Sequence, residues 1–202
     1  MESSKKLFLL DAYALIYRGY YAFIKNPRIN SKGTDTSAVL GFMNSLLEII
    51  RTQNPDYIAV AFDKGGSITR SEMFTEYKSN RDKTPEPILV AIPYIKEILN
   101  SMNISILEKE GYEADDIIGT VAKDAEKNNF KVYMVTPDKD FAQLVSDNIF
   151  LCKPARMGNS MEIWGVDEVK ERFEVNSPEQ VIDYLGMMGD CLLYTSDAAD
   201  DP

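Results

Sequence analysis

The chain has 202 residues, of which 22 are lysine or arginine and 32 are aspartate or glutamate, so its formal net charge is −10. A negative charge of this size argues against a protein that coats nucleic acid nonspecifically. The sequence contains no histidine, which argues against a zinc site, a serine or cysteine triad and an imidazole general base. Water activated by metal ions is then the remaining source of a nucleophile at neutral pH.

Strands and helices are predicted to alternate along the chain. The apolar runs predict strands at 6–11, 56–63, 104–108 and 131–135, and apolar stripes at helical spacing predict helices at 39–50, 88–102 and 115–127, followed by two short helices at 166–173 and 178–188. Thr84 is expected to cap the second helix with Pro85 at its first position, Pro93 to bend it, and Ser177 to cap the last. The pattern predicts an α/β fold: a central, mostly parallel, twisted sheet with helices on both faces.

Acidic residues follow the predicted strands. They are Asp11, Asp63, Asp138, Asp140 and the run at 113–116 that contains Glu113, Asp115 and Asp116. The run alone could simply face the positive end of a helix dipole, which favours each acid by roughly 0.3–1 kcal/mol. The carboxyl ends of parallel strands meet at one edge of a sheet, however, so all seven carboxylates should lie close together. Because they could not all stay ionised without cations, we expect two Mg²⁺ or Mn²⁺ ions about 3.5–4 Å apart.

A basic strip follows the second strand. If 70–81 is helical, Arg70, Tyr77 and Arg81 share one face and Lys78 lies about a quarter-turn away. Cations and an aromatic ring on one face can hold phosphates and stack a base. The same pattern also fits a solvated helix face. The position of the strip just after Asp63 favours a role in binding.

Seven segments in order carry a resemblance to a known family. They are LFLLDAYALIYRGYYAF at 7–23, GTDTSAVLGF at 33–42, AVAFD at 59–63, the stretch from Arg70 to YKSNR at 77–81, GYEADDIIG at 111–119, TPDKDFAQLVSD at 136–147 and YLGMMGD at 184–190. Together they resemble the 5′ nuclease domain of bacterial DNA polymerase I, which is related to flap endonucleases and more distantly to PIN domains.

The resemblance implies hydrolysis of a phosphodiester near the 5′ end of DNA, including 5′ flaps, during replication and repair. It implies two divalent metal ions held by Asp11, Asp63, Glu113, Asp115, Asp116, Asp138, Asp140 and Asp190. It also implies a helical arch at about 64–84, in which Lys78 and Arg81 act on the scissile phosphate and Tyr77 stacks on a base. Arg70, Tyr17, Arg18 and Tyr20 are the other DNA contacts that it suggests.

The family pattern breaks after Asp190. The family continues with a second acid three residues later, an Asn-x-Pro-Gly turn and an element that grips duplex DNA, whereas this chain has Leu193 where that acid is expected. The stretch CLLYTSDAADD at 191–201 resembles a translated sequencing adaptor. We therefore expect a catalytic domain at 1–190 that is cut short at its C-terminal end, and a non-native tail at 191–202. A genuine acidic tail is the alternative, and resequencing the locus with long reads distinguishes the two.

The expected partner is DNA with a 5′ end or flap, with a polymerase domain in the same native chain. The sequence has no signal peptide and no apolar run near 18 residues, so we expect a monomer in the cytoplasm, associated with the nucleoid, and no membrane contact. The lone thiol of Cys152 is compatible with a reducing cytosol. Two alternatives stay open: a PIN-type ribonuclease, which would not need the arch, and a non-catalytic fragment that only binds metal and nucleic acid.

Overall fold

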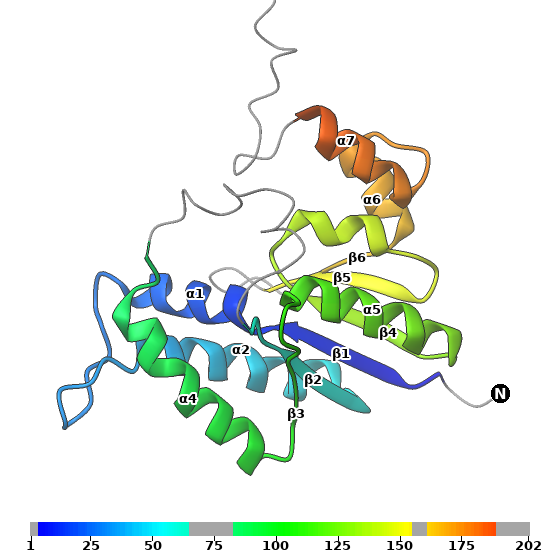
Figure 1. Cartoon of the computed structure of the whole chain (residues 1–202). Coiled ribbons are helices and arrows are strands. Elements are labelled where there is room, and N and C mark those ends of the chain that lie inside the picture. Colours follow the sequence, from blue (N-terminus) through cyan, green and yellow to red (C-terminus); the bar gives the residue numbers. More distant parts are fainter. Residues whose placement is uncertain (1–3, 65–82, 155–160, 189–202) are drawn as a thin grey trace, which may run out of the picture.

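A six-stranded sheet forms the centre of the computed structural model, which describes residues 4–64, 83–154 and 161–188 (Figure 1). The strand order is β3-β2-β1-β4-β5-β6. The strands are β1 (Lys6–Asp11), β2 (Tyr57–Ala61), β3 (Ser105–Leu107), β4 (Lys131–Val135), β5 (Ile149–Lys153) and β6 (Glu162–Trp164). All neighbours pair in parallel except β5 and β6, which are antiparallel. The mostly parallel α/β fold predicted from the sequence is confirmed.

Helices cover both faces of this sheet (Figure 1). They are α1 (Ala12–Phe23), α2 (Ser37–Gln53), α4 (Glu86–Ser101), α5 (Ala114–Lys127), α6 (Val166–Phe173) and α7 (Val181–Met188), with 3-10 helices η1 (Lys139–Leu144) and η2 (Pro178–Gln180). Helices α1, α2 and α4 contribute to the core on one face, and α5, α6 and α7 contribute to the core on the other, together with η1. Phe8 and Leu10 of β1 point to the first group and Leu9 to the second. Residues 7–10 of this central strand are all apolar because the strand is buried on both sides.

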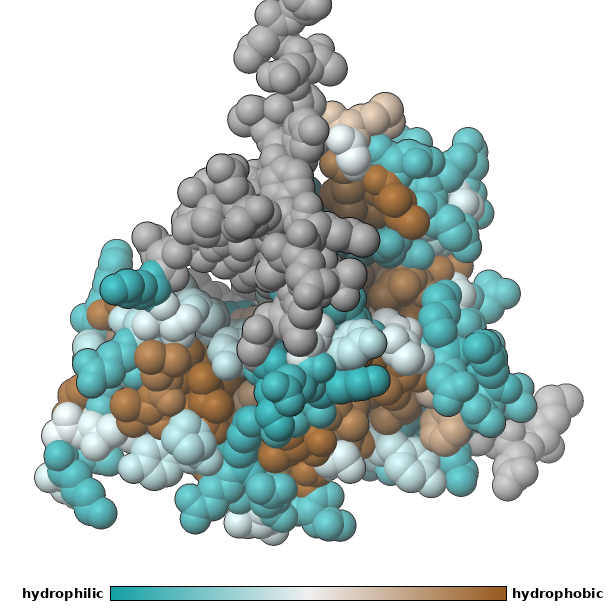
Figure 2. All heavy atoms as spheres, viewed as in Figure 1, coloured by the Kyte–Doolittle hydropathy of each residue, from teal (hydrophilic) through white to brown (hydrophobic). Residues whose placement is uncertain are grey.

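Two aromatic residues from β6 and α6 lie in the core. Trp164 and Phe173 are 5% and 7% exposed and pack edge to face with their ring centroids 6.4 Å apart. Tyr184 is partly buried against Phe173, at 5.3 Å between centroids. On the surface, Figure 2 shows apolar side chains in separate patches with hydrophilic side chains between them. No helix within the described ranges is both long enough and apolar enough to cross a bilayer.

Some helix boundaries differ from the predictions. Helix α4 begins at Glu86, with Pro85 at its N-cap position, so the prediction that Thr84 caps it is wrong. The Thr84 hydroxyl instead accepts a hydrogen bond from the hydroxyl of Tyr17, 3.0 Å away. Pro93 lies inside the continuous helix. The single helix predicted at 178–188 is split into η2 and α7, and neither α1 nor the β5–β6 hairpin was predicted.

The chain changes direction across the sheet between β1 and β4. Strand β1 leads into α1 on one face, whereas α5, on the other face, leads into β4, which pairs with β1 in parallel. A gap opens beyond the carboxyl ends of two such strands, because their connections leave in opposite directions. Asp11 ends β1 at this point, and Thr136 directly follows β4. The fold therefore places these two residues at the topological switch point of the sheet.

Helices α1 and α2 touch through two glycines. A Cβ added to Gly19 would lie 2.9 Å from the Cα of Gly41, and a Cβ added to Gly41 would overlap the backbone of Gly19. Backbone atoms on both sides cannot move aside as a flexible side chain would. We expect Gly41→Ala to lower the free energy of unfolding by about 3 kcal/mol, measured by urea denaturation. The control is Gly186→Ala in α7, where a new Cβ meets nothing within 4 Å; equal midpoints for the two variants would refute the expectation.

Candidate functional site

Asp11 connects the central strand to the first helix. As the N-cap residue of α1, it accepts the N–H of Ala14 at Oδ1, 3.1 Å away. Its Oδ2 accepts the hydroxyl of Thr136 at 3.1 Å. An aspartate is favoured at an N-cap because its oxygen satisfies a backbone donor that has no partner within the helix. Both oxygens of Asp11 are therefore oriented at the switch point.

The negative charge of Asp11 is costly in this position. Burial raises the pKa of its carboxyl from 3.8 to about 6, although the hydrogen bonds from Ala14 and Thr136 oppose the shift. The charges of Asp63 and Asp138 also raise this pKa. Asp63 and Asp138, which follow β2 and β4, are thus close enough for their charges to act on Asp11 at the end of β1. We call Asp11, Asp63 and Asp138 the switch-point group.

Asp63 reaches from the end of β2 to the start of α5. Its Oδ1 accepts the N–H of Ala114, the first residue of that helix, at 2.5 Å. The next acids stand in the same turn: the N–H of Glu113 donates to Asp116 at 3.2 Å, and the N–H of Asp116 donates to Asp115 at 2.7 Å. Glu113 is only 4% exposed. The sequence run at 113–116 thus lies at the N-terminus of α5, where the helix dipole favours acids, and it also caps that helix and lies beside Asp63.

Asp138 begins the turn after β4. Its Oδ1 accepts the N–H of Asp140 at 2.9 Å, and its own N–H donates to the hydroxyl of Thr136 at 3.2 Å. Asp140 lines a cavity of about 720 Å³ between α5 and η1, together with Asp115 and Asp116. We call Asp115, Asp116 and Asp140 the cavity group. Six of the predicted acids therefore fall into two groups, which the hydrogen bond from the N–H of Asp140 to Asp138 connects.

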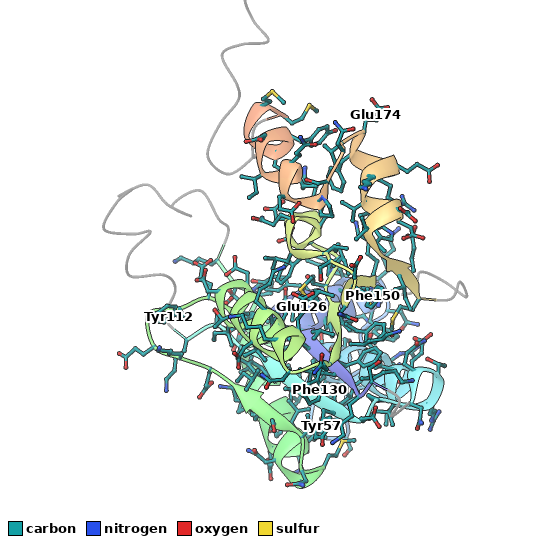
Figure 3. The ribbon with its side chains drawn as sticks, turned by 90° about the vertical axis from the view of Figure 1, so that its right-hand side faces the viewer. Tyr57, Tyr112, Glu126, Phe130, Phe150 and Glu174 are labelled. Carbon is teal, nitrogen blue, oxygen red and sulfur yellow. The ribbon has the colours of Figure 1, made fainter. Side chains whose placement is uncertain are left out.

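The acids lie at one end of the sheet. Figure 3 shows Tyr112, the residue before Glu113, just ahead of α5, and Tyr57 beside Phe130 near the opposite ends of the strands. The expected gathering of the strand-end acids is seen in part. Across residues 4–64, 83–154 and 161–188, no three acidic or cysteine side chains converge closely enough to hold one metal ion. The oxygens described above are instead occupied by backbone N–H groups and by Thr136.

Several predicted site residues fall outside the described ranges. They are Arg70, Tyr77, Lys78, Arg81 and Asp190, and the tail at 191–202 also falls there. The three predicted DNA contacts on α1 are described. Tyr17 bonds to Thr84, Arg18 donates to the hydroxyl of Ser45 at 3.4 Å, and Tyr20 packs against the core. These three residues follow Asp11 along α1.

Thr136 is a member of the site to which the sequence analysis gave no role. It is fully buried, and its hydroxyl lies between Asp11 and the backbone of Asp138. A signal was present in the sequence: a threonine directly follows the apolar run of β4 and precedes Pro137 and Asp138. Hydroxyl residues are common before turns, however, so the pattern alone could not distinguish a site residue from a turn residue.

Comparison with known proteins gives a consistent result. A model of the 5′-3′ exonuclease N-terminal resolvase-like domain matches residues 6–174. The chain is 41% identical to DNA polymerase I of Bacillus subtilis over 191 residues, which cover 94% of the chain and 21% of that protein. It is 38% identical to a 5′-3′ exonuclease of Aquifex aeolicus over 186 residues, which cover 92% of the chain and 62% of that protein. The chain thus spans less than two thirds of either relative.

Solved structures share the fold at lower identity. The T5 D15 protein co-crystallised with metal ions superposes with a TM-score of 0.71 at 19% identity, covering 98% of the chain and 71% of that protein. A complex of the T5 D15 flap endonuclease with DNA and metal ions gives a TM-score of 0.72 at 20% identity, with the same coverage. These likenesses support the fold, and the matched domain covers most of the chain. The chain therefore belongs to the 5′-3′ exonuclease family and contains its N-terminal resolvase-like domain.

Proposed function

We propose that the chain is a metal-dependent 5′ nuclease that hydrolyses phosphodiesters near the 5′ end of DNA, including 5′ flaps, in replication and repair. The observation that carries this proposal is the placement of Asp11, Asp63 and Asp138 at the switch point, where α/β proteins bind their ligands. Family membership supports the same activity, since relatives are named as 5′-3′ exonuclease and DNA polymerase I.

The proposed cofactors are two Mg²⁺ or Mn²⁺ ions, which the chemistry of the donor atoms suits. The available groups are carboxylate oxygens, which hard divalent cations prefer. The described cysteine, Cys152, is buried, and burial raises the pKa of its thiol to about 12, so it offers no thiolate. Burial is the main cause of the raised pKa of Asp11, and a cation would offset the smaller contribution from the charges of Asp63 and Asp138. The proposed ligands are Asp11, Asp63, Glu113, Asp115, Asp116, Asp138, Asp140 and, outside the described residues, Asp190.

Bound divalent ions would polarise a phosphate oxygen and lower the pKa of water. The chain's own residues prepare the place for this chemistry. Backbone N–H groups fix one oxygen each of Asp11, Asp63 and Asp138, so these carboxylates need little reorganisation when substrate arrives. On the sequence alone, Lys78 and Arg81 would stabilise charge on the phosphate, and Arg70 and Tyr77 would bind the strand.

Helix α1 offers a surface for the substrate strand. It begins at Ala12, directly after Asp11, so residues one or two turns along it lie within a few nucleotides of the acids. We assign DNA contacts to Tyr17, Arg18 and Tyr20 on this ground. A flap endonuclease of the same fold has been crystallised with DNA and metal ions, which supports a DNA substrate.

The domain boundaries are also a proposal. Residues 1–190 would form the catalytic domain with an arch at about 64–84, and residues 191–202 would be adaptor read-through. A native chain would continue past Asp190 and carry a polymerase domain, as the DNA polymerase I relatives suggest. We place it in the cytoplasm as a monomer. A native gene that ends in the observed tail would contradict the boundary at 190.

Cleavage of branched substrates tests the activity. The chain with the native continuation of its gene should cut a 5′-flap DNA in Mg²⁺ or Mn²⁺, and EDTA should stop the reaction because the carboxylates alone cannot activate water. The 202-residue chain, assayed in parallel, should be much slower. A matched RNA flap is the control for substrate class. Preferential cleavage of the RNA flap would instead favour a PIN-type ribonuclease, and no metal-dependent cleavage of either would refute the proposal.

A further inference from the structure

We propose that Thr136 is a positioning residue, whose hydroxyl sets the orientation of Asp11 relative to the Asp138 turn and so determines how tightly the switch-point group binds a divalent cation. This inference rests on the proposed function, because it assumes that Asp11 and Asp138 are metal ligands. Thr136 itself would touch neither metal nor substrate.

The hydroxyl of Thr136 is the atom shared by the two aspartates. Its Oγ1 donates to Oδ2 of Asp11 at 3.1 Å and accepts the N–H of Asp138 at 3.2 Å. Asp11 and Asp138 are 127 residues apart in sequence but are joined here through one oxygen atom. A shift of either aspartate would therefore weaken a bond that also holds the other.

Thr136 is itself held from a third direction. Its backbone N–H donates to the carbonyl of Cys152 in the neighbouring strand β5, at 3.1 Å. The residue is fully buried, and a β-branched side chain has few rotamers from which to choose. The sheet thus fixes the direction in which the hydroxyl points. Groups that orient metal ligands in this way commonly change metal affinity by about 10–100-fold when they are removed.

The two hydrogen bonds have a defined direction. Because the N–H of Asp138 can only donate, Oγ1 must accept from it and use its own proton for Asp11. Thr136→Val keeps the shape of the side chain but leaves the N–H of Asp138 without that acceptor and Asp11 without one donor. Thr136→Ser keeps the oxygen and loses only a methyl group. The pair therefore separates the effect of the hydroxyl from the effect of packing.

Mn²⁺ binding to the 202-residue chain, measured by electron paramagnetic resonance, tests the inference without requiring catalysis. Thr136→Val should weaken Mn²⁺ binding by about tenfold or more, and Thr136→Ser should bring the affinity back to within about threefold of wild type. The matched control is Thr52→Val on α2, where the lost hydroxyl donates to the carbonyl of Glu48 and accepts from the side-chain amide of Gln53. Thr136→Ala, which also lacks the hydroxyl, replaces the valine variant if that variant does not fold.

Each result decides the question. Wild-type affinity in Thr136→Val, or an equal loss in Thr136→Ser, would overturn the positioning role, as would failure of both hydroxyl-free variants to fold in EDTA. Flap cleavage by the chain with its native continuation distinguishes a failure of the Thr136 role from a failure of the proposed nuclease function. If wild type cuts and Thr136→Val cuts and binds Mn²⁺ equally well, only the role of Thr136 fails. If wild type neither binds Mn²⁺ nor cuts, the metal-dependent nuclease fails and this inference fails with it.

Discussion

Asp138→Asn, in the chain with its native continuation, is expected to reduce 5′-flap cleavage by about a thousandfold or more while the fold is kept. Asparagine can still accept the N–H of Asp140 at Oδ1, and its backbone can still donate to Thr136, so both hydrogen bonds at this position survive. What is lost is one negative charge at the proposed metal centre. A metal contribution of about 4 kcal/mol to the transition state corresponds to about a thousandfold in rate.

The switch-point group and the cavity group can be tested separately. Asp115→Asn tests the cavity group in the same assay, and we expect a similar loss because both groups are proposed to serve one two-ion centre. The control is Asp56→Asn, which removes an acid that accepts the N–H of Lys6 at 2.7 Å, just before β2 and away from the switch point. Rates are measured under single-turnover conditions at saturating Mg²⁺. Full activity in Asp138→Asn would reject the assignment, whereas full activity in Asp115→Asn alone would confine the metal centre to the switch-point group.

Much of the fold could be predicted from local apolar patterns in the sequence. Strand 6–11 was predicted with the bounds that the structure has, and the predicted strand at 131–135 matches β4. Both are short strands in a parallel sheet. Because such strands are buried on both faces, they appear in the sequence as nearly continuous apolar runs. The β5–β6 hairpin was missed because β6 has only three residues, Glu162–Trp164, two of them exposed. So short a strand has too little periodicity to be recognised.

The site could be predicted as a set of residues but not as a geometry. Strand ends identified Asp11, Asp63 and Asp138, because topology brings them together whatever their separation in sequence. The division between the switch-point group and the cavity group could not be foreseen. It depends on which N–H each carboxylate accepts, such as the contact between Asp63 and Ala114. Thr136 was missed for the same reason: its role depends on two partners that only the folded chain places beside it.

The second large effect concerns Asp11, where the charge proposed to bind metal should weaken the metal-free fold. Its pKa is about 6 in the folded chain and 3.8 as its ordinary value. Between about pH 4 and pH 6 the folded chain therefore keeps a proton that the unfolded chain has released, so this group's contribution to stability falls as pH rises. Above about pH 6 the full cost is present. A shift of this size corresponds to about 3 kcal/mol as an upper limit.

Asp11→Asn should remove that cost. Asparagine can still cap α1 through Ala14, and its amide can donate to the Thr136 hydroxyl in place of accepting from it. In EDTA at pH 8 we expect a gain of about 2 kcal/mol, which raises Tm by about 5 °C for a chain of this length. The gain should vanish below about pH 4, where the wild-type carboxyl is protonated in both states. Calorimetry across this pH range measures it.

Added Mg²⁺ gives the sharper comparison, because a cation should stabilise wild type and not Asp11→Asn. The stability advantage of Asp11→Asn over wild type at pH 8 should therefore shrink as the Mg²⁺ concentration rises. It shrinks because Mg²⁺ binding stabilises the folded wild type and not the variant. Flap cleavage by the extended variant should fall at the same time, so the more stable protein would be the less active one. Asp56→Asn should show neither the gain nor its loss with Mg²⁺. A lower Tm for Asp11→Asn in EDTA at pH 8 would mean that the Asp11 charge is not costly, and that the switch-point group does not need a cation to relieve it.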